Sequence, residues 1–270
     1  MTDIKSPIGV FDSGIGGLTV VREIINDLPN ENIVYFGDTA RVPYGNKSKS
    51  TVLRYSRQIV NFLKTKDVKA IVVACNTASA LALDDLEKEI DIPIIGVVKP
   101  GAYTAINTTK NNRVGVIATQ STVQSRLYQE IIAQKAPKIE VFAKACPLFV
   151  PLVEEGWTDD VITLEVAKRY LSELQDKDID TLILGCTHYP LLSKLLSGYL
   201  GESIKLVNPA LETARSLKKL LTELDMINDS GKVGEHYFYV SDSIDKYIAF
   251  AESILECRIE GAQQIAIEAY

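Results

Sequence analysis

The sequence is poor in the residues that build metal centres and disulfide frameworks. Its 270 residues include only four cysteines and two histidines. The cysteines form no CxxC pair, and His188 and His236 lack the spacing of zinc ligands. We therefore expect no metal site, and free thiols of the kind that a reducing cytosol maintains. The four cysteines are Cys75, Cys146, Cys186 and Cys257.

Features of nucleic-acid-binding, secreted and membrane proteins are also missing. The formal net charge is −6 and no Lys/Arg-rich stripe occurs, which argues against a nucleic-acid partner. No apolar run approaches the length of a membrane span, and the first residues lack a basic-then-apolar signal. With 46% hydrophobic and 24% charged residues, the composition is that of an ordinary globular protein. We expect a cytoplasmic location and no membrane contact.

Apolar strands alternate with helical stretches along the chain, which predicts an α/β fold with mainly parallel sheets. Helical spacing or a turn signal predicts helices after residue 17, over 48–65 and 79–90, after residue 121, and over 159–174, 210–224 and 244–255. Strands are expected to begin near residues 8, 32, 71, 94, 113, 139, 182, 204 and 236. No linker rich in Gly, Ser or Pro divides the chain, so two lobes in close contact are expected.

A weak internal repeat relates the two halves at about 105 to 110 residues. The stretch 113–119 is similar to 8–13, and each half later has a strand that ends in a cysteine. Any two βαβ runs share such a pattern, so the repeat alone leaves chance similarity open.

The two strand-end cysteines are Cys75, after the apolar run 71–74, and Cys186, after 181–185. Ligands of open α/β sheets bind at the carboxyl ends of strands. Two thiols in such places suggest a substrate held between two sulfurs, one removing a proton and the other returning one. A helix N-terminus is expected to lower the pKa of Cys75, although a buried packing thiol is the alternative reading. Cys146 and Cys257 are expected to be packing residues.

Polar side chains accompany these thiols. His188 shares a loop with Cys186 and is suited either to donate to its thiolate or to a structural role. Asp12 and Ser13 follow a strand and open a helix, a pattern that fits either an anion site or a helix cap. It is neither a dinucleotide fingerprint nor a P-loop. Tyr44 lies in a turn where it can bond or cover a ligand.

Four motifs together resemble those of glutamate racemases, within the aspartate/glutamate racemase superfamily. They are Gly9–Leu18 (GVFDSGIGGL), Tyr35–Gly45 (YFGDTARVPYG), Ala74–Ser79 (ACNTAS) and Leu184–Pro190 (LGCTHYP). The resemblance spans essentially the whole chain. It implies two α/β lobes related by a pseudo-two-fold axis, with the active site between them. It places residues 1–98 and 207–270 in the first lobe and 99–206 in the second.

The resemblance also implies the site. Cys75 and Cys186 would be the acid/base thiols, with Cys186 as the base in the L-to-D direction. The groups that tune them would be Asp12, Asp38, Glu154 and His188. The substrate-binding residues would be Asp12, Ser13, Tyr44, Gly45, Asn76, Thr77, Thr187 and His188. The resemblance does not decide which of the neighbouring residues Glu154 and Glu155 faces the site.

By the same resemblance the substrate would be glutamate, no cofactor would be needed, and the product would supply D-glutamate for peptidoglycan. A homodimer is suggested. One position departs from the family pattern: Lys99 stands where a glutamate is usual, before Pro100. This change reverses a charge where the chain should cross between lobes and removes no site residue.

Other interpretations remain open. The chain could be an aspartate or hydantoin racemase. It could also be a decarboxylase of the superfamily, but such an enzyme would keep one thiol and this chain has two. A two-lobed amino-acid-binding protein would leave both strand-end thiols unexplained. A thiol redox protein would join Cys75 and Cys186 in a disulfide, against which the absence of CxxC argues.

Overall fold

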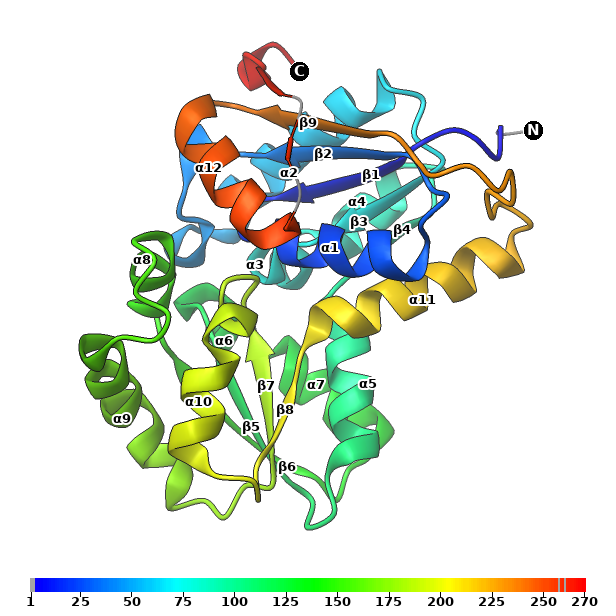
Figure 1. Cartoon of the computed structure of the whole chain (residues 1–270). Helices are drawn as coiled ribbons and strands as arrows, with labels where there is room; N and C mark the ends of the chain where they lie inside the picture. The colour runs from blue at the N-terminus through cyan, green and yellow to red at the C-terminus, as the bar shows by residue number, and fades with distance from the viewer. Residues whose placement is uncertain (1–2, 257, 260) are drawn as a thin grey trace.

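The computed structural model describes residues 3–256, 258–259 and 261–270, so Cys257 lies outside the described residues. Within them the chain forms two parallel sheets, one above the other in Figure 1. The first has the order β10-β9-β2-β1-β3-β4 and the second β6-β5-β7-β8. The predicted α/β class with parallel sheets is confirmed.

The strands of the first sheet are β1 (Ile8–Asp12), β2 (Ile33–Gly37), β3 (Ala70–Val73), β4 (Ile94–Gly96), β9 (His236–Val240) and β10 (Ala262–Gln264). Those of the second are β5 (Arg113–Ala118), β6 (Glu140–Ala145), β7 (Thr181–Gly185) and β8 (Lys205–Val207).

Helices cover these sheets. The helices around the first sheet are α1 (Leu18–Asp27), α2 (Lys49–Lys64), α3 (Asn76–Leu81), α4 (Leu83–Glu89), α11 (Pro209–Glu223) and α12 (Ile244–Leu255). Those around the second are α5 (Val98–Thr108), α6 (Gln120–Ser125), α7 (Leu127–Lys135), α8 (Phe149–Glu154), α9 (Val161–Gln175) and α10 (Ser193–Leu200). Among the described helices, none is both long enough and apolar enough to cross a lipid bilayer.

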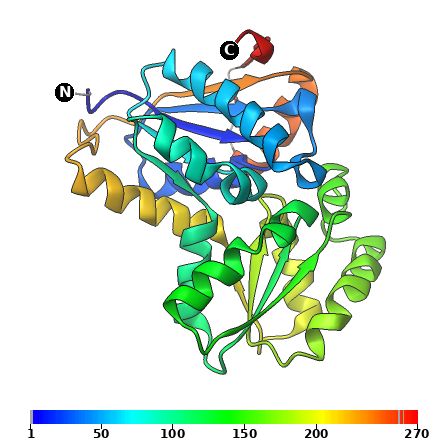
Figure 2. The ribbon, with the colours of Figure 1, turned by 180° about the vertical axis from the view of Figure 1, so that it is seen from behind.

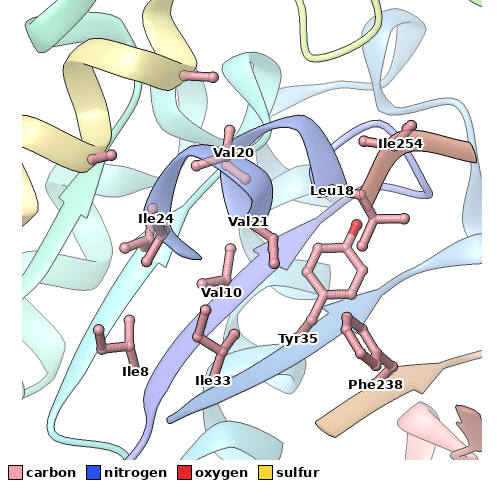
Figure 3. Packing of buried hydrophobic residues seen from close by; sticks show 14 of the residues in the cluster. Ile8, Val10, Leu18, Val20, Val21, Ile24, Ile33, Tyr35, Phe238 and Ile254 are labelled. Atoms are coloured by element: carbon pink, nitrogen blue, oxygen red, sulfur yellow. The ribbon is translucent and has the colours of Figure 1, made fainter. Parts of the chain in front are cut away.

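The central strand β1 is buried along its whole length because it faces a helix layer on each side. Alternate side chains point to opposite faces of a strand, so Val10 joins the core under α1 and α12 while Phe11 joins the core under α2. Figure 3 shows Val10 of β1 and Tyr35 of β2, in the first sheet, facing Val21 of α1. Figure 2 shows the opposite face of this sheet, covered by the cyan helices. Burial on both faces explains why these strands are continuous apolar runs.

The strand order repeats between the sheets. The order β6-β5-β7-β8 matches the order β2-β1-β3-β4, so β1 corresponds to β5 and β3 to β7. The strands that precede Cys75 and Cys186 therefore hold the same place in their sheets. The first sheet takes its strands from residues 8–96 and 236–264 and the second from 113–207. Lobe boundaries at 98/99 and 206/207 stay a prediction.

One expected helix was wrong in its bounds, and the helices α5, α8 and α10 and the strand β10 were not expected. The helix expected over 79–90 begins at Asn76, because the Cys75 sulfur accepts the Ala78 N–H and caps it, and Ala82 separates it into α3 and α4. The helix α5 was not expected, since Pro100 and Gly101 are helix breakers. Pro100 lies in the first turn, where a missing N–H costs no intrahelical bond. The polar strand β10 was also missed.

The chain passes from the first sheet to the second through α5 and returns through α11. These two helices pack against each other, and α11 runs along the boundary between the sheets in Figure 1. The departure from the family pattern, Lys99, is exposed in the first turn of α5. Burial raises the pKa of Glu87, and the positive charge of Lys99 lowers it by less than burial raises it.

Candidate active site

A cavity of about 360 Å³ lies where the carboxyl ends of both sheets meet. Both Cys75 and Cys186 line it, although they come from different sheets. The other expected site residues in its wall are Ser13, Tyr44, Gly45, Asn76, Thr77, Glu154, Thr187 and His188. Further lining residues are Val42, Pro43, Asn46, Thr119, Gln120, Pro147, Val150 and Pro151. Asp12 and Asp38 are buried and lie outside this lining.

Cys75 is the N-cap residue of α3. Its Sγ lies 3.4 Å from the N–H of Ala78, which donates to it, and 3.5 Å from the Oγ of Ser13. Burial, together with the negative charge of Asp12, raises the pKa of Cys75 to about 12. The bonds with Ser13 and Ala78 lower this pKa but do not offset burial. The helix N-terminus thus lowers this pKa through the Ala78 N–H, as expected, but burial outweighs that effect and the net shift is upward.

The second thiol, Cys186, contacts His188, which in turn contacts Glu154. The Sγ of Cys186 lies 3.8 Å from Nδ1 of His188, and Nε2 of His188 lies 3.1 Å from Oε1 of Glu154. Burial lowers the pKa of His188, but its bonds with Cys186 and Glu154 raise it overall to about 10. His188 is therefore an imidazolium at neutral pH. Glu154 makes this contact from α8, whereas Glu155 is exposed, so the structure distinguishes the two carboxylates.

Asp12 links the loop after β1 to the loop after β7. Its Oδ2 accepts the Gly14 N–H at 3.1 Å, and its Oδ1 accepts the hydroxyl of Thr187 at 3.5 Å. Burial raises the pKa of Asp12, while the charge of His188 and nearby backbone N–H groups lower it. Its influence on Cys75 is electrostatic, through this charge. Asp12 therefore joins loops from both sheets behind the cavity wall.

Asp38 holds Tyr44. Its carboxylate accepts hydrogen bonds from the phenol of Tyr44, from Nε of Arg41 at 2.7 and 2.9 Å, and from the hydroxyl of Ser241 at 2.9 Å. Burial raises the pKa of Asp38, and the bonds from Tyr44 and Arg41 lower it. The contacts of Asp38 thus orient a residue of the cavity wall. Its expected tuning of a thiol stays a prediction.

Hydrogen bonds also join the two lobes beside the cavity. The hydroxyls of Thr77 and Thr119 lie 2.9 Å apart, those of Thr77 and Thr122 lie 3.3 Å apart, and the phenol of Tyr128 donates to Oδ1 of Asn76 at 2.7 Å. None of Thr119, Thr122 and Tyr128 was expected near the site. The repeat held a signal for Thr119, which follows β5 as Ser13 follows β1.

The chemistry available is acid/base. No group of three or more His, Cys, Asp or Glu side chains suited to a metal ion occurs within the described part of the chain. Instead, two thiols share one cavity, one beside a hydroxyl and a carboxylate, the other beside an imidazolium. Such an arrangement suits proton transfer at a carbon placed between the sulfurs.

Comparison with known proteins gives the family. A sequence model of the family described as Asp/Glu/hydantoin racemase matches residues 8–217. The chain belongs to the Asp/Glu/hydantoin racemase family. The curated glutamate racemase of Geobacter metallireducens is 48% identical over 262 residues, which is 97% of each chain. The expected resemblance to glutamate racemases, and with it an isomerase acting on amino acids, is confirmed.

Solved structures of racemases from this family share the fold. The glutamate racemase of Francisella tularensis, solved in complex with D-glutamate, is 42% identical, with a TM-score of 0.93 over 99% of this chain and 100% of that one. The glutamate racemase of Thermus thermophilus, solved in complex with β-chloro-D-alanine, is 43% identical, with a TM-score of 0.89 over the same shares. The two-sheet architecture of this racemase-family chain is therefore that of its relatives.

Proposed function

We propose that the protein interconverts L-glutamate and D-glutamate, with Cys75 and Cys186 as the two acid/base groups. The observation that carries the proposal is that both thiols, which follow equivalent strands of the two sheets, open into one cavity. The relatives described above are named glutamate racemases, and one was solved with D-glutamate, which supports glutamate as the substrate.

In the L-to-D direction the Cys186 thiolate removes the α-proton, and the Cys75 thiol delivers a proton to the opposite face of the carbon. The reaction leaves Cys186 as a thiol and Cys75 as a thiolate, which is the starting state for the reverse direction. The imidazolium of His188 donates a hydrogen bond to the sulfur of Cys186, which lies 3.8 Å from its Nδ1. The high pKa of Cys75 keeps it protonated and ready to act as the acid.

The reverse direction needs Cys75 as a thiolate, which its pKa of about 12 opposes. The substrate itself carries an α-ammonium group, and a positive charge close to a thiol lowers its pKa. Glutamate binding therefore helps to ionise the sulfur that must take its proton. This coupling favours reaction only when substrate is in place.

The carbanion intermediate spreads its charge onto the α-carboxylate, so donors to that carboxylate stabilise the transition state. The amide of Asn76 and the hydroxyl of Thr77 line the cavity beside the thiols and are the donors that we assign to the substrate carboxylates. Thr187, whose hydroxyl donates to Asp12, lines the cavity beside Cys186 and contacts the substrate there. Tyr44 and Gly45 come from the short 3-10 helix Tyr44–Asn46 and form another part of the cavity wall.

We propose that these charged and polar groups suffice without a cofactor, since thiols supply both proton transfers and His188 with Glu154 supplies the electrostatic support. We further propose, from the family resemblance, that the protein works in the cytoplasm as a homodimer and that its D-glutamate enters peptidoglycan.

The test is incubation of the purified protein with L-glutamate in D₂O, without added cofactor. Loss of optical rotation, with deuterium at the α-carbon of the D-glutamate formed, is the expected result. L-Aspartate serves as the comparison substrate, and faster racemisation of aspartate would overturn the assignment of glutamate. Binding of glutamate with no exchange at the α-carbon would instead indicate a binding protein.

A further inference from the structure

Tyr128 is a buried tyrosine for which the acid/base scheme has no role. It lies in the first turn of α7 in the second lobe, and only 1% of its surface is exposed. Its phenol oxygen lies 2.7 Å from Oδ1 of Asn76, which belongs to α3 in the first lobe. The side chain therefore crosses the boundary between the lobes to reach the residue that follows Cys75.

The ring of Tyr128 also packs behind the second thiol. A Cβ atom added to Gly185, the residue before Cys186, would lie 3.3 Å from the ring carbon Cε2. A Cβ atom added to Gly101 of α5 would lie 3.5 Å from the phenol oxygen. Tyr128 thus packs between β7, which precedes Cys186, and α5.

The direction of this hydrogen bond matters for the substrate. The phenol of Tyr128 donates to Oδ1 of Asn76, and burial, which raises its pKa well above the usual range, keeps the donated proton in place. With Oδ1 of Asn76 accepting that bond, Nδ2 is the remaining polar group of the amide. Asn76 lines the cavity, so this NH₂ is the group that it offers to an anionic substrate.

We propose that Tyr128 is a positioning residue that fixes the amide of Asn76 with its NH₂ toward the cavity, as a donor to a substrate carboxylate. This inference rests on the proposed function. Without the phenol the amide has no partner to distinguish its two ends, and rotation by half a turn would present Oδ1 to the carboxylate. An oxygen facing a carboxylate repels it, so binding would weaken.

The test is a double-mutant cycle on glutamate racemisation with Tyr128→Phe and Asn76→Ala. Phenylalanine keeps the ring against Gly185 and removes only the donor. We expect Tyr128→Phe to lower kcat/KM by about tenfold, the size expected when a buried hydrogen bond is lost. In the Asn76→Ala background the same change should alter kcat/KM by less than about twofold, because Tyr128 acts through Asn76. A purely structural role predicts equal effects in both backgrounds and would overturn the inference.

Two further variants sharpen the result. Tyr247→Phe is the matched control, since Tyr247 is a buried tyrosine whose hydroxyl has no hydrogen-bond partner among the described residues. It should leave kcat/KM unchanged. Asn76→Asp keeps an acceptor for Tyr128 but lacks NH₂, so it should lose at least as much activity as Asn76→Ala. Full activity of Asn76→Asp would overturn the donor role, even if Tyr128→Phe failed to fold.

The outcomes separate this inference from the proposed function. A parent protein that does not racemise glutamate overturns both. An active parent with additive effects of Tyr128→Phe and Asn76→Ala overturns only the positioning role of Tyr128.

Discussion

Glu154 Oε1 lies 3.1 Å from His188 Nε2, on the side of the imidazole ring that faces away from Cys186. The carboxylate is supplied by α8 and the histidine by the loop after β7, so two separate segments of the second lobe meet at the ring. A carboxylate in this place fixes the ring orientation and stabilises the imidazolium, which in turn supports the thiolate. Because only Glu154 makes this contact, the adjacent Glu155 provides a matched control for its substitution.

Glu154→Gln should lower kcat by about tenfold to a hundredfold, because a neutral amide supports the imidazolium less well than a carboxylate. Glu155→Gln removes the same charge one residue away, from an exposed side chain, and should retain nearly full activity. Steady-state kinetics with both glutamate enantiomers measures the difference. Equal losses in the two variants would contradict the assignment of Glu154 to the site.

Cys75→Ser and Cys186→Ser should each reduce racemisation by at least about a thousandfold, since a serine hydroxyl is a far weaker acid/base group at neutral pH. Circular dichroism should show an unchanged fold. Cys146→Ser is the control, because Cys146 is also a buried free thiol but does not line the cavity. Full turnover in either of the first two variants would rule out the two-thiol scheme.

The raised pKa of His188 makes stability depend on pH. The folded protein holds the His188 proton up to a pKa of about 10, whereas the unfolded chain releases it near 6.5. The contribution of His188 to the free energy of unfolding is therefore complete below pH 6.5 and is lost as the pH rises toward 10, by up to about 1.4 kcal/mol per pH unit. The raised pKa of Cys75 acts in the same direction above pH 9.

Urea denaturation between pH 6.5 and 9 measures this slope in the parent and in His188→Asn, which lacks the titrating group. The variant should have the flatter profile in this range. An identical decline in both proteins would show that His188 is not charged in the folded state.

Gly16→Ala should impair catalysis through steric displacement. A Cβ atom at Gly16 would lie 2.5 Å from the Thr187 hydroxyl and 2.6 Å from Nδ1 of His188, both too close. A misplacement of about 1 Å costs on the order of a hundredfold in rate, and we expect a loss of that size in kcat/KM. Gly198→Ala on α10 meets no atom within 4 Å and should keep its activity while gaining about 0.5 to 1 kcal/mol of stability. Normal activity of Gly16→Ala would mean that the loop after Cys186 adapts freely.

Much of this molecule could be predicted from local sequence because its strands are continuous apolar runs ending in polar residues. The positions of Cys75 and Cys186 at strand ends followed from that pattern alone. The choice between Glu154 and Glu155 did not, since neighbouring residues on a helix differ by about 100° in direction and only packing fixes which one faces inward. Tertiary structure also decided the pKa of Cys75, because burial outweighs the local effect of its helix.

Tyr128 illustrates the limit most clearly. Its partner Asn76 is 52 residues away in the sequence. On α7 it resembles any buried aromatic residue, and no motif distinguishes a packing tyrosine from a donor that crosses between lobes. Contacts of this kind become visible only when the two sheets are placed together.

The two thiols occupy equivalent strand ends, yet their neighbours differ: Cys75 has Ser13 and the charge of Asp12, while Cys186 has His188. For a racemase, thermodynamics limits how far this difference between the two thiols can affect the kinetics of the two enantiomers. Mirror-image amino acids have equal free energies in water, so kcat/KM must be the same for both enantiomers, whatever surrounds each sulfur. The unlike neighbourhoods can therefore make one enantiomer turn over faster only if that enantiomer also has the proportionally higher KM.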